Sequence, residues 1–454
     1  MARKLRVAVG LLFLAIFLTS VLAVPLAVAQ SSSPTQLRWR IAKRAHPGVR
    51  LKRHTPSPTP PPAPATTYSH PSLILTPAEI AIIKQRVAAG VQPEKDAYQR
   101  LLNSYVSPAM SGSPNVYAGP YTGNSLDEER AVFGQLWTDG ARARDLAIAY
   151  VVSDNADYAQ KARTYLMASA QGNTPTVWTD SGCIDTGQLQ SYGSFSFAYA
   201  YDLTFNSGVY SEADRSAITA YFRTMADALQ TCNAYDIELS AVRTPRTLDK
   251  AYDWSSLLYC RYDTIVGGDF AVLVQAASLA LAQASDYTTL VNKILYDDSF
   301  LLNLDAMLSC ALTPTNQGDG VPGHPVPVPA LYIYCNPVAG RGSAMDYMTY
   351  NARVLDVMVE VAQKIGWNPT QVTAARQKLF NTWSYLARFF GPNAEPLANQ
   401  NDRINADACL PRFQLPLHEF GGSVFLDVVR SGSQAGYYEP QLLGPTALTH
   451  SITP

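Results

Sequence analysis

The chain has 454 residues, with 35 Lys and Arg against 36 Asp and Glu. Ten of these cations lie within the first 53 residues, where there is no acid, so the remainder carries 25 cations against 36 acids, a net charge of −11. An acidic body argues against nucleic acid as a partner, and any groove for an anionic polymer would have to be basic only locally.

Residues 1–29 have the composition of a secretory signal peptide. A basic start is followed by an apolar run over residues 7–23, and Ala27-Val28-Ala29 has the small-x-small pattern that signal peptidase requires. We therefore predict export to the periplasm, the cell surface or the medium, with an uncleaved N-terminal anchor as the alternative.

Residues 30–67 predict a disordered linker. Its first part is basic, with Arg38, Arg40, Lys43, Arg44, Arg50, Lys52 and Arg53. The Pro-rich spacer TPSPTPPPAPATT follows. The basic part could contact an anionic cell surface, although a solvated tail explains it equally simply.

Six cysteines in an exported chain indicate disulfide bonds. They are Cys183, Cys232, Cys260, Cys310, Cys335 and Cys409. Their fifteen pairings cannot be resolved from the sequence. No two of them form a CxxC pair and histidine is sparse, so neither a zinc site nor any other metal or cofactor is predicted.

From residue 70 onward the apolar residues recur at helical spacing. Thr76, Pro77 and Glu79 predict a capped helix start. Further helices are predicted over 93–105, 141–153, 156–170, 188–203 and 211–229, and Ser211 with Asp214 resembles a second capping box.

The second half continues the pattern with helices over 267–284, 287–312, 351–365 and 369–390. Successive helices make five or six antiparallel pairs, so we predict an all-α fold, an α/α toroid formed by one domain over residues 68–454. A β-rich segment after Arg412 is a weaker expectation.

One long connection stands out between these helices. Residues 316–343 form a Gly/Pro/aromatic loop that contains Asp319, His324 and Arg341 and leads into a helix with Tyr347 and Tyr350. Loops of this length in compact domains are usually functional or disordered. The aromatic content favours function.

Several stretches together resemble the alginate lyase family. They are HPSLILTPAEIAIIKQRVAAG, ARDLAIAYVVSDNADYAQKARTYLMA, FAYAYDLTFNSGVYSEADRSAITAYF, Asp319-Gly320 and YMTYNARVLDVMVEVAQKIGW. Their order along most of residues 70–390 is more specific than any one of them. The resemblance implies an α/α toroid that cleaves a uronate-containing polysaccharide by β-elimination.

That reaction defines the residues to look for. A base must remove a weakly acidic proton next to the sugar carboxylate, and a cation or hydrogen-bond donor that neutralises the carboxylate lowers the barrier. A Tyr or His near both the proton and the leaving oxygen can act as base and then as acid. The reaction does not require a metal.

The first candidate stretch is YDWSSLLYCRY, residues 252–262. The family usually has an Asn-Trp or Asn-His element here, whereas this chain has Asp253-Trp254. An ionised Asp253 would repel the substrate carboxylate, and Arg261 could compensate. We assign Trp254, Tyr259 and Arg261, together with Asp319, to substrate binding; packing explains the aromatic residues about as well.

The second candidate stretch begins at Arg341. Family members place Arg, then Tyr-His, then Tyr before an apolar helix; here Arg341 and Tyr350 fit, while Asp346-Tyr347 replaces the Tyr-His pair. The resemblance implies Tyr347 or Tyr350 as base and acid, Arg341 as neutraliser and His324 as a further catalytic candidate. The alternative is that both tyrosines are inward-facing aromatics at an i, i+3 spacing.

Two other functions remain open. Asp319 with Asp346, or Asp185, could be the paired carboxylates of a glycoside hydrolase, which need a separation of roughly 5 to 10 Å across the substrate. The chain could instead be a non-catalytic glycan-binding protein at the cell surface, on an acidic or neutral polysaccharide. The sequence does not indicate the polymer, the cleavage mode or the oligomeric state.

Overall fold

The structure is a computed structural model. It describes residues 70–115, 126–172, 183–225, 314–315, 328–329, 344–364, 367–390, 394, 410–431, 438–439 and 442–451. Within these ranges the side chains at 126–133, 183–190, 314–315, 328–329, 344–348, 350 and 351 are not described. All of these belong to the unit Pro60–Pro454. The signal peptide, the linker, the helices at 267–312 and all six cysteine side chains lie outside the described part, so these expectations stay predictions.

The first helix, α3 (Pro77–Ala88), begins as its sequence predicts. The Thr76 side chain accepts from the Glu79 N–H at 3.3 Å, and the Thr76 N–H donates to the Glu79 carboxylate at 2.6 Å. This reciprocal pair satisfies two of the N–H groups that a helix start leaves unpaired. Next, α4 (Glu94–Arg100) continues through a π-helical turn, η1 (Leu101–Val106), into α5 (Ser107–Ser111), so the helix predicted over 93–105 is present and extends further.

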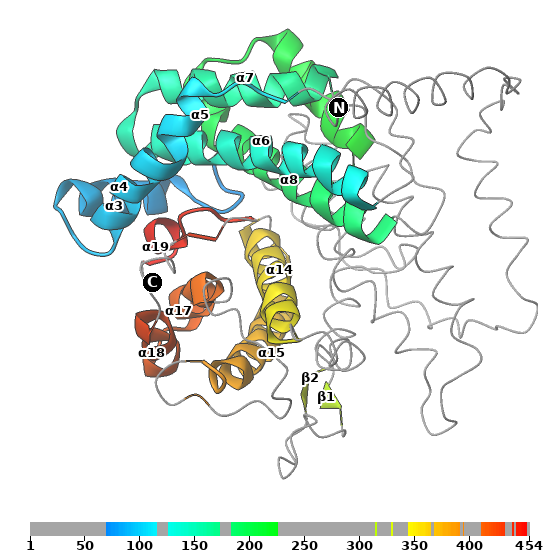
Figure 1. The fold of residues 1–454 in the computed structure, drawn as a ribbon. Coiled ribbons are helices and arrows are strands. Elements are labelled where there is room, and N and C mark those ends of the chain that lie inside the picture. Colours follow the sequence, from blue (N-terminus) through cyan, green and yellow to red (C-terminus); the bar gives the residue numbers. More distant parts are fainter. Residues whose placement is uncertain are drawn as a thin grey trace, which may run out of the picture. The chain divides into compact units, whose positions relative to one another are not determined.

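A layer of long helices follows (Figure 1). It contains α6 (Leu126–Ser153), α7 (Ala156–Gly172), α8 (Cys183–Thr204), the short η2 (Phe205–Ser207) and helical residues 212–225. The predicted turn between α6 and α7 is confirmed at Asp154, which has a φ of 59°. Gly140 of α6 lies so close to Gly193 of α8 that a Cβ on Gly140 would be 2.5 Å from the Gly193 carbonyl oxygen. Two glycines therefore allow these helices to pack backbone against backbone.

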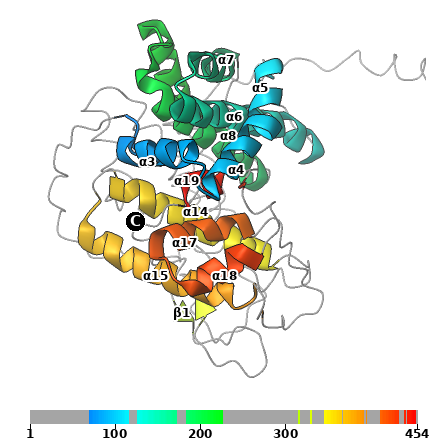
Figure 2. The same ribbon diagram turned by 90° about the vertical axis from the view of Figure 1, so that its left-hand side faces the viewer.

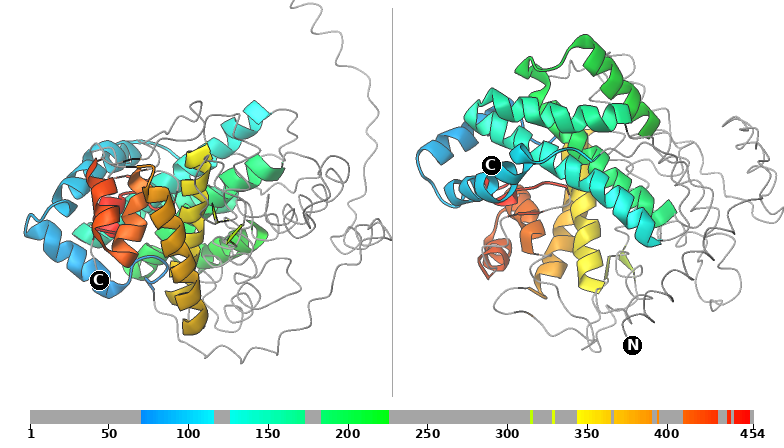
Figure 3. Two further views of the ribbon diagram at one scale, coloured as in Figure 1. Left: turned by 90° about the horizontal axis from the view of Figure 1, so that it is seen from below. Right: turned by 45° about the horizontal axis from the view of Figure 1, so that its top comes forward.

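The second group of helices is built on the hairpin of α14 (Ala344–Lys364) and α15 (Pro369–Ala387), which lie side by side in Figure 3. Asn368 caps α15 by accepting from the Thr370 N–H at 2.9 Å. The short helices η4 (Leu410–Phe413), α17 (Gln414–Phe420) and α18 (Ser423–Ser431) pack beside it (Figure 2). α19 (Thr446–Thr449) packs against η4, α17 and α4. The expectation of a β-rich segment after Arg412 is wrong for the described residues, which are mainly helical there.

The two strands that the structure describes are short. β1 (Pro314–Thr315) pairs antiparallel with β2 (Val328–Pro329), with Pro314 opposite Pro329 and Thr315 opposite Val328. They belong to the connection that precedes α14.

Contacts between early and late residues join the two helical groups. The Lys364 ammonium at the end of α14 donates to the Ile74 carbonyl before α3, and the Ser451 hydroxyl donates to the Glu94 carboxylate at 2.8 Å. Residues 352–359 of α14 are all buried. The helix predicted to carry the proton-transfer residue is therefore central to the core.

Candidate functional site

The structure locates the predicted site residues only in part. Arg341, His324, Asp319, Trp254, Tyr259 and Arg261 lie outside the described residues. Tyr347 and Tyr350 lie in the first half of α14, where the backbone is described and their side chains are not. α14 begins at Ala344, so both tyrosines lie on a helix, as the sequence predicts.

A polar stripe runs along α14 and includes the turn of Tyr350. Its members are spaced by four, three, four and four residues, so they share one face of the helix. They are Thr349, Arg353, Asp356, Glu360 and Lys364. Polar groups buried in this way are stable only when each has a partner, and every one of the five has a hydrogen bond or ion pair to a residue outside α14.

The stripe begins with two contacts to the C-terminal segment. Arg412 Nη1 donates to Thr349 Oγ1 at 2.8 Å, and Arg353 Nη1 donates to Glu439 Oε1 at 2.5 Å. These four residues are at most 4% exposed. Burial opposes ionisation of Glu439, but Arg353, the backbone N–H groups of its own turn and Arg412 outweigh it and lower the pKa of Glu439 to about 2.

Glu439 is itself held by a tight turn. Its Oε2 accepts from the Leu442 N–H at 2.7 Å and the Leu443 N–H at 3.1 Å, and its backbone pairs with Gly444 in both directions. Gly444 has a φ of +72°, and a Cβ there would be 2.9 Å from the Arg144 Nε. Glycine at this position therefore permits both the turn and the close approach of α6.

A second buried pair on α6 supports that turn. Arg144 Nε donates to Asp145 Oδ1 at 3.0 Å, and the Tyr438 hydroxyl donates to Asp145 Oδ2 at 2.6 Å. Tyr105 stacks on the Tyr438 ring at 3.7 Å between centroids. The residue before Glu439 is thus fixed against α6 and η1 by both charge and ring packing.

Further along α14, two carboxyl groups meet. Asp356, 2% exposed, accepts from the Trp383 indole N–H at 2.8 Å and hydrogen-bonds Glu419, which pairs with Arg376. Burial and the Glu419 charge raise the pKa of Asp356 well above its usual range. A glycosidase pair would face the substrate, whereas this one faces Trp383 and Arg376, so we assign it to packing of the core.

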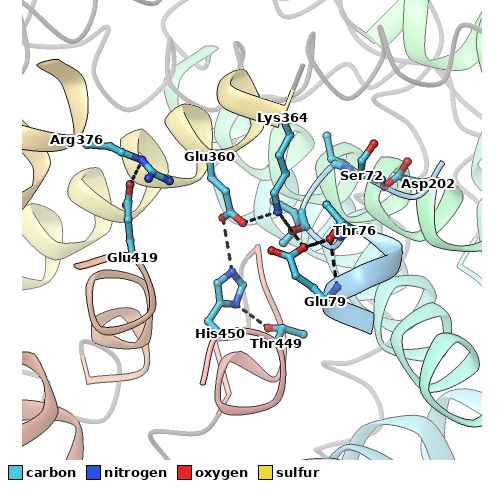
Figure 4. A network of polar contacts seen from close by, with 12 residues as sticks. Ser72, Thr76, Glu79, Asp202, Glu360, Lys364, Arg376, Glu419, Thr449 and His450 are labelled. Atoms are coloured by element: carbon cyan, nitrogen blue, oxygen red, sulfur yellow. Dashed lines mark hydrogen bonds and ion pairs between the residues drawn. The ribbon is translucent and has the colours of Figure 1, made fainter. Parts of the chain in front are cut away.

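The last part of the stripe is the network in Figure 4. Lys364 Nζ lies 2.9 Å from Glu360 and 3.5 Å from Glu79, and His450 Nε2 lies 3.7 Å from Glu360. Thr449 Oγ1 is 2.7 Å from His450 Nδ1. Burial disfavours charge on Glu360, but Lys364 and His450 outweigh it and hold its pKa far below its usual range. The network connects α14 to the start of α3 and to α19.

Sequence reasoning did not find this stripe. Arg353, Asp356 and Glu360 interrupt an apolar helix at spacings of three and four, which is a signal of a polar inner face. Their partners at Arg412 and Glu439 come from segments without any apolar periodicity. Hence the buried polar positions of α14 could have been predicted from the sequence, whereas their partners Arg412 and Glu439 could not.

Among the described residues, no group of three or more His, Cys, Asp and Glu side chains is arranged to hold a metal ion. No helix of the described part is long and apolar enough to cross a membrane.

Solved structures provide the comparison that sequence matching does not. Neither a protein-family model nor a curated protein sequence matches the chain. An alginate lyase from Bacteroides ovatus superposes with a TM-score of 0.50 at 14% identity, over 83% of this chain and 99% of that one. A variant of alginate lyase A1-III complexed with tetrasaccharide also superposes with a TM-score of 0.50, at 13% identity, over 84% of this chain and 98% of that one.

The fold is that of the alginate lyases. The α/α toroid predicted from the helix pairs and from the resemblance is therefore confirmed. At these identities the alginate lyase fold is all that the similarity establishes, and it covers nearly the full length of both solved chains. The roles of Tyr347, Tyr350, Arg341 and the other candidate residues stay predictions.

Proposed function

We propose that the chain is an exported polysaccharide lyase that cleaves a uronate-containing polysaccharide by β-elimination without a metal. The observation that carries the proposal is the alginate lyase fold, shared over more than four fifths of the chain. One of the similar structures is an alginate lyase complexed with tetrasaccharide, which supports a polysaccharide as the substrate. Fold alone does not determine function, so the proposal also depends on the candidate residues.

In the proposed mechanism, the ionised side-chain oxygen of Tyr350 or Tyr347 removes the proton next to the sugar carboxylate. The electron pair of that C–H bond forms a double bond in the sugar ring, and the glycosidic C–O bond breaks on the leaving side. The same tyrosine then returns the proton to the leaving oxygen, so that atoms and charges balance. Arg341 neutralises the carboxylate while negative charge develops on it. Asp319, Trp254, Tyr259 and Arg261 are proposed to bind the polymer, and His324 is a further catalytic candidate.

A helix is a suitable support for such a group. α14 is buried along residues 352–359 and fixed by its polar stripe, so a side chain on its first turns has a rigid base. A catalytic base typically contributes about 10²- to 10⁴-fold to the rate. We therefore expect Tyr350→Phe or Tyr347→Phe to lower kcat by at least about 10²-fold.

The test is an assay of the purified full chain on alginate, pectate, hyaluronan and heparan sulfate. Ultraviolet absorbance reports the unsaturated product of β-elimination, and a separate assay counts new reducing ends. Absorbance that rises in wild type and is lost in one tyrosine variant supports the proposal. Tyr158→Phe, a partly buried tyrosine of α7, serves as the matched control.

Other outcomes identify the alternatives. New reducing ends without absorbance would indicate a glycoside hydrolase with carboxylates such as Asp319, Asp346 or Asp185. Retention on immobilised polysaccharide without either signal would indicate a glycan-binding protein. Export is tested separately, by locating the protein and sequencing its N-terminus for cleavage after residue 29.

A further inference from the structure

The turn of α14 that carries Tyr350 is held by residues that follow it in the chain by about 60 to 90 positions. Thr349 precedes Tyr350 directly and Arg353 lies one turn beyond it, on the same face as Thr349. Arg412 hydrogen-bonds Thr349, and Glu439 pairs with Arg353. We call these four residues, Thr349, Arg353, Arg412 and Glu439, the α14 clamp.

The clamp forms one electrostatic unit. Arg412 lies near enough to Glu439 to help lower its pKa, in addition to its bond with Thr349. Glu439 therefore accepts from the Arg353 guanidinium and from two backbone N–H groups, and the Arg412 charge also favours its ionised form. Bonds between charged groups are shorter and stronger than neutral ones, and in a buried site they restrict geometry closely.

The clamp is anchored on its far side as well. Tyr438, next to Glu439, receives a bond from Arg144 Nη2 at 2.9 Å and donates to Asp145, both on α6. Thus α14 is connected through one turn of backbone to the longest helix that the structure describes. The connection fixes the rotation of α14 about its axis and its position along that axis.

Burial alone does not explain these residues. Apolar side chains of similar volume often stabilise a core as well as a buried ion pair does, and a buried charge that loses its partner is strongly unfavourable. A buried ion pair can instead select one arrangement among several. Here the selected arrangement is the placement of the helical turn that carries Tyr350.

We propose that Thr349, Arg353, Arg412 and Glu439 are positioning residues, which fix the α14 turn so that position 350 meets the substrate in a productive geometry. This inference rests on the proposed lyase function. A displacement of about 1 Å at a reacting group can cost about 10²-fold in rate. Loosening the clamp is therefore expected to lower kcat and to leave KM nearly unchanged.

The mildest test is Thr349→Val, which removes the hydroxyl that Arg412 bonds and keeps the branched shape. Its matched control is Thr382→Val on α15, because Thr382 is also buried and its hydroxyl donates within its own helix, to the Lys378 carbonyl at 3.0 Å. We expect kcat on the active polymer to fall roughly 10-fold or more in Thr349→Val, within the range that misplacement of a reacting group produces. Glu439→Gln should lower kcat further, and Thr382→Val should leave it unchanged.

A second readout does not need activity. Tyr350→3-fluorotyrosine places a single fluorine label on α14, and its NMR spectrum reports the environment of that position. In the presence of Thr349→Val the resonance should shift or broaden, whereas Thr382→Val should leave it as in wild type. Circular dichroism at the assay temperature establishes that each variant is folded, and Thr349→Val keeps the test usable if Glu439→Gln does not fold.

The outcomes separate the two proposals. An inactive wild type whose label responds to Thr349→Val refutes the lyase function and supports the clamp. An active wild type in which Thr349→Val changes neither kcat nor the fluorine spectrum refutes the clamp and leaves the lyase intact. Equal effects of Thr349→Val and Thr382→Val also refute it, because a general loss of core packing would then explain both.

Discussion

Replacing Glu439 by glutamine is expected to remove a part of the stability that depends on pH. The pKa of Glu439 falls from its ordinary value of 4.5 to about 2 in the folded protein. A lower pKa when folded means that ionised Glu439 stabilises the fold, fully above pH 4.5, and that this contribution is lost as pH falls from 4.5 toward 2. Glutamine resembles the protonated acid and cannot provide the stabilisation that ionised Glu439 gives.

The size of the effect follows from the same values. Each unit of pKa difference corresponds to about 1.4 kcal/mol, so the lowering from 4.5 to about 2 is worth about 3 kcal/mol of unfolding free energy at pH 7. Since Glu439 is 1% exposed, screening by solvent does not reduce this figure greatly. At pH 4 the difference between wild type and Glu439→Gln should be smaller by about 1 kcal/mol.

Urea unfolding followed by circular dichroism at pH 7, 5 and 4 measures this difference. Glu212→Gln is the control, because Glu212 is exposed on the helix at 212–225. A Glu439→Gln effect that is below about 1 kcal/mol, or that stays constant from pH 7 to pH 4, would refute the assignment of Glu439 as an ionised, buried partner of Arg353.

Two further predictions concern the same core. Gly444→Ala should lower the free energy of unfolding by about 2 kcal/mol or more, because φ is +72° and a Cβ would meet Arg144 and Asp145 at 2.9 Å. The control Gly208→Ala should lower it by only about 1 kcal/mol, because Gly208 has a φ of +80° but a Cβ there would have no atom within 4 Å. Equal melting temperatures of the two variants would contradict this prediction. Asp356→Asn should gain stability relative to wild type as pH rises from 4 to 8, because a raised pKa means that protonated Asp356 stabilises the fold at low pH and that this stabilisation is lost on ionisation. A difference in melting temperature between the two proteins that does not change in this direction with pH would contradict the raised pKa of Asp356.

The local signals in the sequence were sufficient for three of the helix starts. The capping boxes at Thr76 and Ser211 and the Asn368-Pro369 start depend on residues at most three apart, and all three are confirmed. The early part of α6 was missed because Gly134 and Gly140 weaken its helical pattern. Gly140 is required there by the contact with Gly193 of α8, a tertiary cause that no local pattern contains.

The α14 stripe shows the limit of this reasoning for the site. The resemblance to alginate lyases directs attention to Tyr347 and Tyr350, and the toroid on which that expectation depends is confirmed. What supports the helix, however, is Arg412 and Glu439, and a one-dimensional pattern cannot pair residue 353 with residue 439. Buried charges find their partners through the fold, so they are predictable only after the topology is known.

The same pairing constrains how the fold can form. Hairpin α14–α15 alone would leave Arg353 without Glu439. Burying Arg353 in the absence of this partner would cost about 3 to 5 kcal/mol, a large part of the stability of a typical domain. Hence the inner face of α14 becomes stable only when the segment from residue 410 to 451 docks on it. The turn that carries Tyr350 would acquire its final geometry at that step. In the proposed lyase, docking of residues 410–451 would therefore complete a site whose candidate residues all lie earlier in the chain.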